Sequence, residues 1–204
     1  MMKINTIKSI LFSAIVATAF TSCTNDDDFE IHQYRDVIFS EDFSENAVDN
    51  QLLITPGWIN IAEVGALRWK TQIYQGNAYA EFTSYQSQDV TNIGWLISPE
   101  IDMDQHENEK LLFRAAQSFV SSAANSLQVL VSNDFDGTNV ANATWVPLNP
   151  TLPTTTSPYF EFIKSGEVDL SSFTGKIRLG FKVKGGKDNA IDGTYQVDNI
   201  RIIY

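Results

Sequence analysis

The sequence predicts an all-β protein, a jelly-roll β-sandwich. Three observations predict this fold class. Short segments alternate apolar and polar residues, turns rich in Gly, Asn and Asp separate these segments at close intervals, and no segment keeps a helical period over three turns. Many short strands joined by tight turns are typical of sandwiches and jelly rolls. We expect the folded domain to cover residues 37–204, after an N-terminal signal peptide and an acidic tether.

The clearest expected strand covers residues 176–184. Every second residue from Ile177 to Val183 is apolar and the residues between are basic or glycine, which places the apolar side chains on one face of a sheet. Other segments suit strands through alternation or through β-branched and aromatic residues. In chain order they are residues 37–43, 68–74, 79–85, 111–119, 127–131, 160–163 and 196–203. Turn signals lie at residues 75–77, 134–137, 174–175 and 185–186, and the Pro- and Thr-rich segment 149–158 is expected to be a loop.

The composition indicates an acidic globular protein. Of the 204 residues, 14 are Lys or Arg and 25 are Asp or Glu, which gives a net charge of −11. A chain this acidic repels phosphate backbones, so no nucleic-acid partner is expected. Hydrophobic residues make up 43% of the chain and aromatic residues 12%, which argues against disorder. The single Cys excludes an intrachain disulfide and a Cys-cluster zinc site, and two His residues make a His-based metal centre or catalytic triad hard to build.

Residues 1–22 have the layout of a lipoprotein signal peptide. Two lysines form a positive region, and the apolar segment that follows, residues 10–20, is shorter than the ~20 residues that span a bilayer. The segment ends in Phe-Thr-Ser-Cys at residues 20–23, which resembles the lipobox of bacterial lipoproteins, with Phe20 in place of the usual Leu. The resemblance implies lipidation of Cys23 and a membrane partner through this anchor. The alternative is a buried free Cys23 at the end of a core helix.

Residues 23–36 are expected to carry the lipidated Cys and to form a solvated tether, because they are polar and acidic and lack periodicity. The acidic run from Asp26 to Glu30 resembles the surface-export signal of lipoproteins in some Gram-negative bacteria. This resemblance implies a protein anchored in the outer membrane and facing the cell exterior. The alternative is a charged spacer that only holds the domain away from the membrane. His32 lies in this tether and is expected to be exposed rather than functional.

Several short motifs in the predicted domain, taken in order, resemble one family. They lie at residues 39–43, 57–58, 95–102, 127–137, 168–175 and 197–200. In this order they resemble the choice-of-anchor J and cleaved-adhesin group of bacterial surface domains, which are MAM-like jelly rolls. The resemblance covers the expected domain and implies a non-catalytic module on the cell surface that acts in adhesion or ligand binding and carries structural calcium. Carbohydrate and extracellular protein are the candidate ligands.

Two alternatives to a binding module stay open. Glu100, Asp102 and Asp104 would share one face of a strand and resemble the three alternating acids of a jelly-roll glycosidase family, in which two carboxylates ~5 Å apart carry a retaining mechanism. Asp104 stands where that family has Glu, and Pro99 favours a strand end, so we expect a solvated turn and no enzymatic activity. The other alternative is a structural subunit of an outer-membrane complex. Such a subunit should show a contiguous apolar patch, an enzyme should show paired carboxylates in a cleft, and a sugar binder should show at least two aromatic rings on one face.

Aromatic side chains are the expected ligand contacts, because exposed rings can stack on the faces of sugars. Trp58 and Trp69 flank predicted loops and are the leading candidates, with packing in the core as the alternative for both. Trp95 and Trp145 lie in apolar surroundings and are expected in the core. Further surface candidates are Tyr74, Tyr79 and Tyr85, and His106 is expected to be exposed in a polar loop.

A structural calcium site is expected between the first and the last strand, as the family resemblance implies. If the apolar residues of segment 37–43 face the core, a period of two places Glu41 on the same inward face, where an unpaired charge is costly. On the last strand, Asp198 stands where the apolar alternation fails, which suggests a β-bulge that re-aims it. The expected ligands of Ca²⁺ are Glu41, Asp42 and Asp198, with Asn46 in reserve. The alternatives are hydrogen bonds from backbone amides to these acids, and a rival site at the turn 134–137, which turn chemistry alone can explain.

Overall fold

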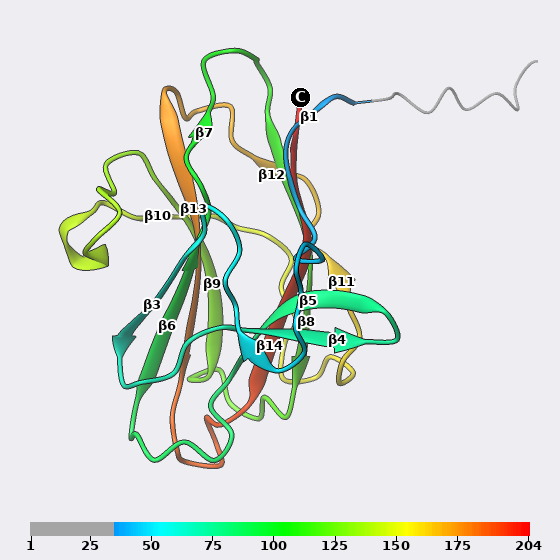
Figure 1. Ribbon diagram of the computed structural model, residues 1–204, viewed down its shortest axis with the longest axis vertical. Coiled ribbons are helices and arrows are strands. Elements are labelled where there is room, and N and C mark those ends of the chain that lie inside the picture. Colours follow the sequence, from blue (N-terminus) through cyan, green and yellow to red (C-terminus); the bar gives the residue numbers. More distant parts are fainter. Residues whose placement is uncertain (1–34) are drawn as a thin grey trace, which may run out of the picture. The chain divides into compact units, whose positions relative to one another are not determined.

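The computed structural model describes residues 35–204. No α-helix occurs among these residues, and the strands lie in two antiparallel sheets, so the predicted jelly-roll β-sandwich is confirmed (Figure 1). The strands are β1 (Val37–Glu41), β2 (Gln51–Leu52), β3 (Ile59–Val64), β4 (Lys70–Tyr74), β5 (Asn77–Thr83), β6 (Asn92–Ile97), β7 (Ile101–Asp102), β8 (Lys110–Ser118), β9 (Ser126–Ser132), β10 (Val146–Pro147), β11 (Ile163–Lys164), β12 (Val168–Asp169), β13 (Lys176–Gly185) and β14 (Thr194–Ile203). A short 3-10 turn, η2 (Val140–Asn142), precedes β10.

The predictions for the N-terminal region fall outside the described residues. They are the signal peptide at residues 1–22, the lipidation of Cys23, the exposure of His32 and most of the tether. Between residues 35 and 204, no helix has the length and apolar character needed to cross a bilayer.

The larger sheet, sheet A, has the strand order β11-β8-β14-β5-β4-β2, with β1 paired to β14 and β12 paired to β8. Strand β14 changes partner along its length, because residues 194–197 pair with β5 and residues 200–203 pair with β1. The register of β14 against β8 shifts between Asp198 and Arg201, and Asn199 has a left-handed φ of 51°. The β-bulge predicted at Asp198 is therefore confirmed.

The second sheet, sheet B, has the order β10-β9-β13-β6-β3, with β7 paired to one end of β13. Phe181 at the centre of β13 lies opposite Val129 of β9 and Leu96 of β6. Every second residue from Ile177 to Val183 is fully buried, as the alternation predicts. This strand therefore supplies one wall of the core.

The main core fills the space between the two sheets. Phe113 of β8 meets Phe181 of β13 edge to face, with ring centroids 5.5 Å apart. Phe82 of β5 meets the ring of Trp69 at 5.8 Å in the same manner. A Cβ at Gly94 of β6 would collide with the Phe82 ring, so the absence of a side chain at position 94 allows this packing. Burial of each large apolar side chain contributes ~1.5–3 kcal/mol to folding.

A smaller apolar cluster lies on the outer face of sheet B. The loop between β9 and β10 folds over this face and packs its own apolar side chains against the sheet. The buried members of the cluster are Trp95, Ile97, Leu130, Phe135 and Val140. Trp95 is thus buried as predicted, and Trp145 packs on it with ring centroids 4.8 Å apart and is itself partly buried. The outer face of sheet B is therefore covered by this loop.

Candidate ligand-binding groove

The outer face of sheet A is hollowed into a groove. Side chains alternate along β5, so that Phe82 points into the core while Tyr79 and Glu81 point outward. Two adjoining hollows of about 670 and 710 Å³ share Glu81 and Phe160 in their lining. We call them together the sheet A groove; it extends from Tyr74 past Glu81, Gln196 and Phe160 to Tyr85.

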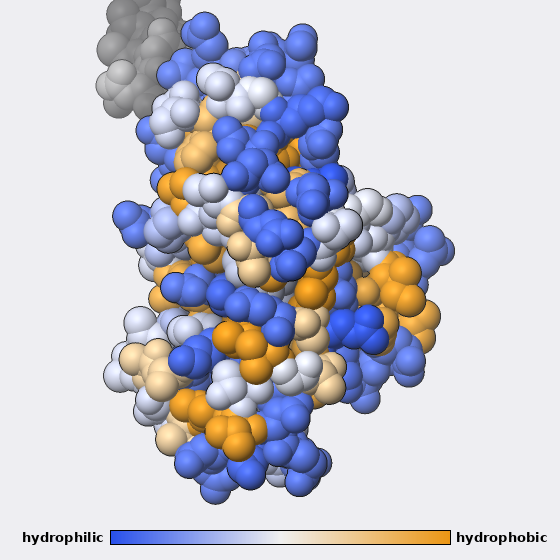
Figure 2. Space-filling model, turned by 90° about the vertical axis from the view of Figure 1, so that its left-hand side faces the viewer, coloured by the Kyte–Doolittle hydropathy of each residue, from blue (hydrophilic) through white to orange (hydrophobic). Residues whose placement is uncertain are grey.

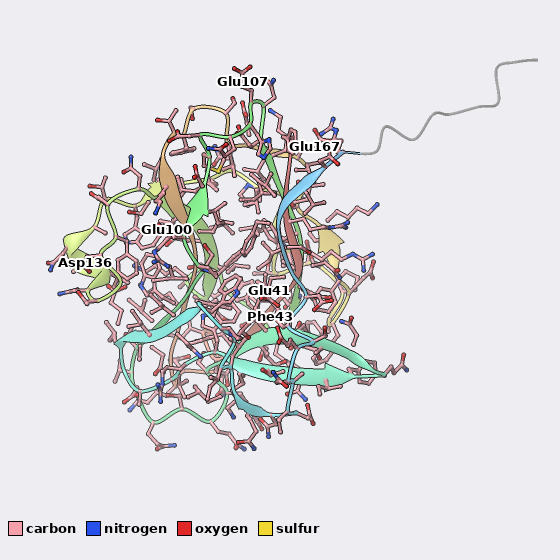
Figure 3. The ribbon with its side chains drawn as sticks, turned by 45° about the horizontal axis from the view of Figure 1, so that its top comes forward. Glu41, Phe43, Glu100, Glu107, Asp136 and Glu167 are labelled. Atoms are coloured by element: carbon pink, nitrogen blue, oxygen red, sulfur yellow. The ribbon has the colours of Figure 1, made fainter. Side chains whose placement is uncertain are left out.

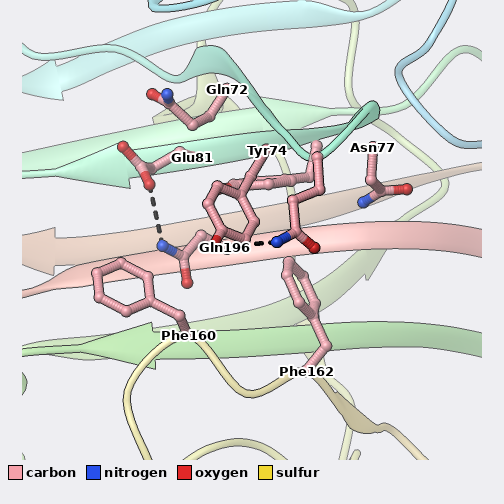
Figure 4. A pocket seen from close by; sticks show the side chains of 9 residues that line it. Gln72, Tyr74, Asn77, Glu81, Phe160, Phe162 and Gln196 are labelled. Atoms are coloured by element: carbon pink, nitrogen blue, oxygen red, sulfur yellow. Dashed lines mark hydrogen bonds between the residues drawn. The ribbon is translucent and has the colours of Figure 1, made fainter.

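The segment just before β11 forms one wall of the groove. Its backbone is tied to sheet A by the N–H of Phe160, which donates to the carbonyl of Gln117 at 2.8 Å. Phe162 packs edge to face on Tyr79 with ring centroids 5.3 Å apart. Figure 4 shows Gln196 on the floor between Glu81 on one side and Phe160 and Phe162 on the other. The groove thus has an aromatic wall beside a polar floor.

Exposed aromatic side chains gather at this groove. Five aromatic residues that line it are between 53% and 66% exposed: Tyr74, Tyr85, Phe119, Tyr159 and Phe160. Among residues 35–204, Tyr204 is the remaining exposed aromatic residue, and it is not part of the groove lining. Apolar surface concentrated in one place marks an interaction site more often than scattered exposed residues do.

The backbone holds two of these rings at the surface in a costly conformation. Phe119 has a φ of 58° and Phe160 a φ of 62°. The left-handed region costs a bulky L-residue roughly 1–2 kcal/mol. Burial does not offset this cost, because the two side chains are 60% and 56% exposed. Nine non-Gly residues among residues 35–204 have a left-handed φ, and these two are the ones with exposed aromatic rings.

The floor of the groove holds a buried polar pair. Gln196 is 1% exposed, and its Nε2 donates to Oε2 of Glu81 at 2.9 Å. The Oε1 of Gln196 is buried and has no hydrogen-bond partner among the described residues. The opposite orientation of the amide would place its oxygen against the carboxylate, so the hydrogen bond to Glu81 fixes the orientation. An unpaired buried acceptor costs about 1–3 kcal/mol, a cost that a ligand with a donor group would remove.

Burial also perturbs the two titratable groups on the floor. Burial raises the pKa of Glu81, and the hydrogen bond from Gln196 opposes this rise only in part. Burial and the nearby charge of Glu81 raise the pKa of Tyr79 to about 12. The Tyr79 hydroxyl therefore keeps its proton at neutral pH and remains a hydrogen-bond donor.

The two tryptophans predicted as ligand contacts do not lie in the groove. Trp69 is fully buried in the main core, so the prediction that it contacts a ligand at the surface is wrong and packing accounts for it. Trp58 is partly buried, packs against Phe43 with ring centroids 5.3 Å apart, and donates its Nε1 hydrogen to Glu41 Oε2 at 2.9 Å. The groove instead contains the tyrosines that the sequence analysis proposed as further candidates: Tyr74, Tyr79 and Tyr85.

Sequence reasoning missed the aromatic residues of the wall and of the β8 end. Phe119 and Phe160 lie in segments predicted as strands, where aromatic rings are expected to be buried, and Tyr159 lies between the predicted loop 149–158 and the predicted strand 160–163. One available signal was the position of Tyr159 and Phe160 directly after Pro158, at the end of a loop rich in Pro and Thr. Aromatic residues that follow such a loop are placed at its edge rather than in a core strand.

Each of the three acids in the glycosidase hypothesis forms an ion pair or a hydrogen bond with a nearby group. Glu100 pairs with Lys176 at 2.6 Å, and this contact lowers the pKa of Glu100, whereas a catalytic acid needs a raised pKa. Asp102 Oδ1 accepts the backbone N–H of Asp104 at 3.0 Å, and Asp104 Oδ1 accepts the N–H of Gly175 at 2.7 Å. β7 has only two residues, Ile101–Asp102, so Glu100 and Asp104 lie outside it and the three acids do not share one extended strand.

The predicted calcium ligands are engaged in hydrogen bonds. Glu41 Oε1 accepts the N–H of Phe43 at 2.7 Å, and Asp42 Oδ1 accepts the N–H of Ser44 at 3.0 Å. Asp198 is 2% exposed, and its carboxylate accepts from the backbone and side chain of Asn199 and from Asn77 Nδ2 at 3.0 Å. In the part of the chain that the structure describes, no three His, Cys, Asp or Glu side chains are grouped to hold a metal ion.

The chemistry of these donors nevertheless suits a hard cation. Burial raises the pKa of Asp198, and the charge of Asp42 adds to the rise. Carboxylate and amide oxygens are the ligands that Ca²⁺ takes in proteins. At the rival site, Asp134 and Asp136 accept hydrogen bonds from Thr144 and Thr138, as turn chemistry requires.

His106 lies in the polar loop after β7, as expected from the sequence. Its ring stacks on Tyr204 with a centroid distance of 3.8 Å, and it is partly buried rather than fully exposed. A packing role at the C-terminus therefore accounts for this residue.

Comparison with known proteins identifies a class of fold. No family model matches the sequence, and no curated protein matches it. Among solved structures, the chain has the fold of cleaved adhesin domains. The K1 domain of Lys-gingipain from Porphyromonas gingivalis W83 matches with a TM-score of 0.52 and 18% identity, over 80% of this chain and 96% of that domain. The K2 domain matches with a TM-score of 0.54 and 14% identity over 81% and 98%, and the K3 domain with 0.50 and 17% over 83% and 100%.

Proposed function

We propose that this protein is a surface-displayed, non-catalytic binding module that holds a carbohydrate chain in the sheet A groove. One observation carries the proposal: five exposed aromatic rings border a groove whose floor holds a buried amide oxygen without a partner. Aromatic rings offer flat apolar faces to the C–H groups of a sugar. Sugar hydroxyls supply the donors that Gln196 and Glu81 lack.

The alternatives find less support in the described residues. The cleaved adhesin domains share the fold, and at 18% identity or less this likeness speaks for the fold alone. Of the acids in the glycosidase hypothesis, Glu100 pairs with Lys176 and Asp104 accepts the N–H of Gly175. For a structural subunit we expect one broad apolar patch, whereas the face in Figure 2 carries separate apolar patches with hydrophilic residues between them.

A binding screen with alanine variants tests the carbohydrate proposal. The purified full chain is applied to an array of plant, fungal and bacterial glycans, and the affinity for a retained glycan is then measured by calorimetry. Tyr74→Ala and Phe160→Ala should each weaken binding about tenfold, since loss of an aromatic anchor typically costs more than 1 kcal/mol. Tyr204→Ala is the matched control, because it removes an exposed ring outside the groove. Unchanged affinity in both groove variants, or an equal loss in the control, contradicts the proposal.

Display at the outer membrane depends on the lipid anchor proposed at Cys23. The support is the sequence of residues 1–23, with its positive region, its short apolar segment and a lone Cys at the end. Cells that express the chain are fed a fatty-acid analogue, which should label the wild type and not Cys23→Ala. Equal label in the two proteins rejects the anchor. Protease accessibility of intact cells then tests the outward orientation.

A structural Ca²⁺ at Asp198, with Asp42 and Glu41 as further ligands, is the proposed cofactor. Its support is the buried carboxylate of Asp198 at the bulge of β14, next to the residues of β14 that pair with β1. A cation that binds only the folded state stabilises it by mass action. The melting temperature should fall in excess EDTA, recover with Ca²⁺, and lose this response in Asp198→Ala. An unchanged melting curve in EDTA, with no metal by elemental analysis, would mean that hydrogen bonds alone satisfy these acids.

A further inference from the structure

We infer that the sheet A groove selects an uncharged, hydroxyl-rich glycan chain and rejects glycans that carry carboxylate or sulfate groups. This inference rests on the proposed function, because it names the class of carbohydrate that the groove accepts. It is carried by the charges, the hydrogen-bonding groups and the layout of the groove.

The charged side chains of the groove are all acidic. Glu81 and Asp192 line it, and no described residue of its lining is Lys, Arg or His. Lys70 lies opposite Glu81 on β4 and acts on its charge, but Lys70 is outside the lining and its Nζ donates to Asn50 Oδ1 at 3.2 Å. Asp49 adds further negative charge that acts on Glu81. An anionic ligand would therefore meet like charge without a basic partner.

The Tyr79 hydroxyl on the floor is a donor, whereas the two groups at the centre of the groove, Glu81 and Gln196, present acceptors. An ionised Glu81 carboxylate can only accept, and Gln196 Oε1 is an acceptor without a partner among the described residues. A sugar hydroxyl donates to such acceptors, whereas the oxygens of a sugar carboxylate or sulfate cannot. The centre of the groove thus favours hydroxyl groups at the point where an acidic substituent would be repelled.

The layout of the groove forces a bound chain to pass this centre. Glu81 and Phe160 line both hollows, with Tyr74 in one and Tyr85 and Phe119 in the other. β5 runs beneath both from Asn77 to Thr83, about 20 Å at ~3.3 Å per residue. A chain that reaches aromatic rings in both hollows therefore crosses Glu81. A single like-charge contact in a half-buried site weakens binding about tenfold, which corresponds to ~1.4 kcal/mol.

Matched polysaccharide pairs test this inference directly. Affinity electrophoresis of the full chain compares hydroxyethyl cellulose with carboxymethyl cellulose and dextran with dextran sulfate. Each pair shares a similar backbone and differs in charge. We expect the neutral member to retard the protein and the anionic member of the same pair to bind at least tenfold more weakly at low salt, with a smaller gap at high salt.

Glu81→Gln separates charge from shape. In this variant, the ratio of the affinity for the neutral member to the affinity for the anionic member should fall about tenfold. The reason is that the substitution removes the carboxylate and keeps the size of the side chain. Glu107→Gln is the matched control: it makes the same change on an exposed loop outside the groove (Figure 3) and should leave the gap unchanged. Equal or tighter binding of an anionic member, abolished by Phe160→Ala, overturns the inference and leaves the proposed function standing. Retardation by no member of any pair overturns the proposed function, and the inference with it. A gap that persists in Glu81→Gln refutes the role assigned to this carboxylate.

Discussion

Truncation of Trp69 should reduce stability and leave ligand binding intact. Its side chain is fully buried, its ring meets the edge of Phe82, and its backbone N–H donates to Asn60 Oδ1 at 3.0 Å. One feature of the site is unfavourable: the indole Nε1 is buried without a hydrogen-bond partner among the described residues. The two substitutions Trp69→Ala and Trp69→Phe therefore have different expected costs.

The magnitudes follow from the size of the cavity and from the unpaired N–H group. Trp69→Ala opens a large cavity in the core and should lower the free energy of unfolding by about 3–5 kcal/mol. For a domain of this size, 1 kcal/mol shifts the melting temperature by roughly 2–4 °C, so a fall of roughly 6–20 °C is expected. Trp69→Phe removes less volume and also removes a buried unpaired donor that costs about 1–3 kcal/mol, so its net cost should be about 0–2 kcal/mol.

Urea unfolding and thermal melting of the two variants measure these differences, with binding of a retained glycan measured well below the melting temperature. Both variants should bind as the wild type does. Equal destabilisation by Trp69→Phe and Trp69→Ala would show that the indole N–H has a partner. Loss of binding with unchanged stability would place Trp69 in a ligand site and refute its burial in the core.

Three further predictions concern the core, the groove and the turn after β6. Gly94→Ala should lower the free energy of unfolding by about 1–3 kcal/mol in urea, because its Cβ would collide with the Phe82 ring; an unaffected protein would contradict the close packing. Burial raises the folded-state pKa of Glu81 above its unfolded value, so its ionised form destabilises the fold above that pKa, and this cost disappears as the pH falls below the unfolded value. Glu81→Gln should therefore be more stable than the wild type at pH 7, with the difference closing toward pH 4 in chemical denaturation; a difference independent of pH refutes the assignment. Reducing-sugar assays should detect no hydrolysis of common polysaccharides, and hydrolysis that vanishes in Glu100→Gln would revive the glycosidase hypothesis.

The strands of the core could be predicted because each buries one face. Alternation from Ile177 to Val183 matches alternate burial in β13, and the failure of alternation at Asp198 marks the bulge in β14. The same reasoning fails at residues 160–163, where alternating aromatic residues were read as a strand. Phe160 instead has a left-handed φ and an exposed ring, and only the last residue of that segment enters β11.

The groove itself could not be predicted from local patterns. It combines β5, the end of β8, the wall before β11 and the start of β14, which are brought together by strand pairing between distant parts of the chain. Gln196 donates to Glu81 across a sequence separation of 115 residues. Trp69 is likewise held by contacts with Asn60 and Phe82. Its position beside a predicted loop therefore does not indicate whether its side chain points into the core or toward solvent.

The crystal structure of the complex with a neutral oligosaccharide, retained in the array, tests the central claim most directly. We predict density for the sugar chain along the sheet A groove, with sugar rings against at least two of Tyr74, Tyr159 and Phe160. A sugar hydroxyl should lie within hydrogen-bond distance of Gln196 Oε1, at about 2.6–3.2 Å. A sugar chain bound on sheet B or at the loops, with the groove empty, would contradict the account.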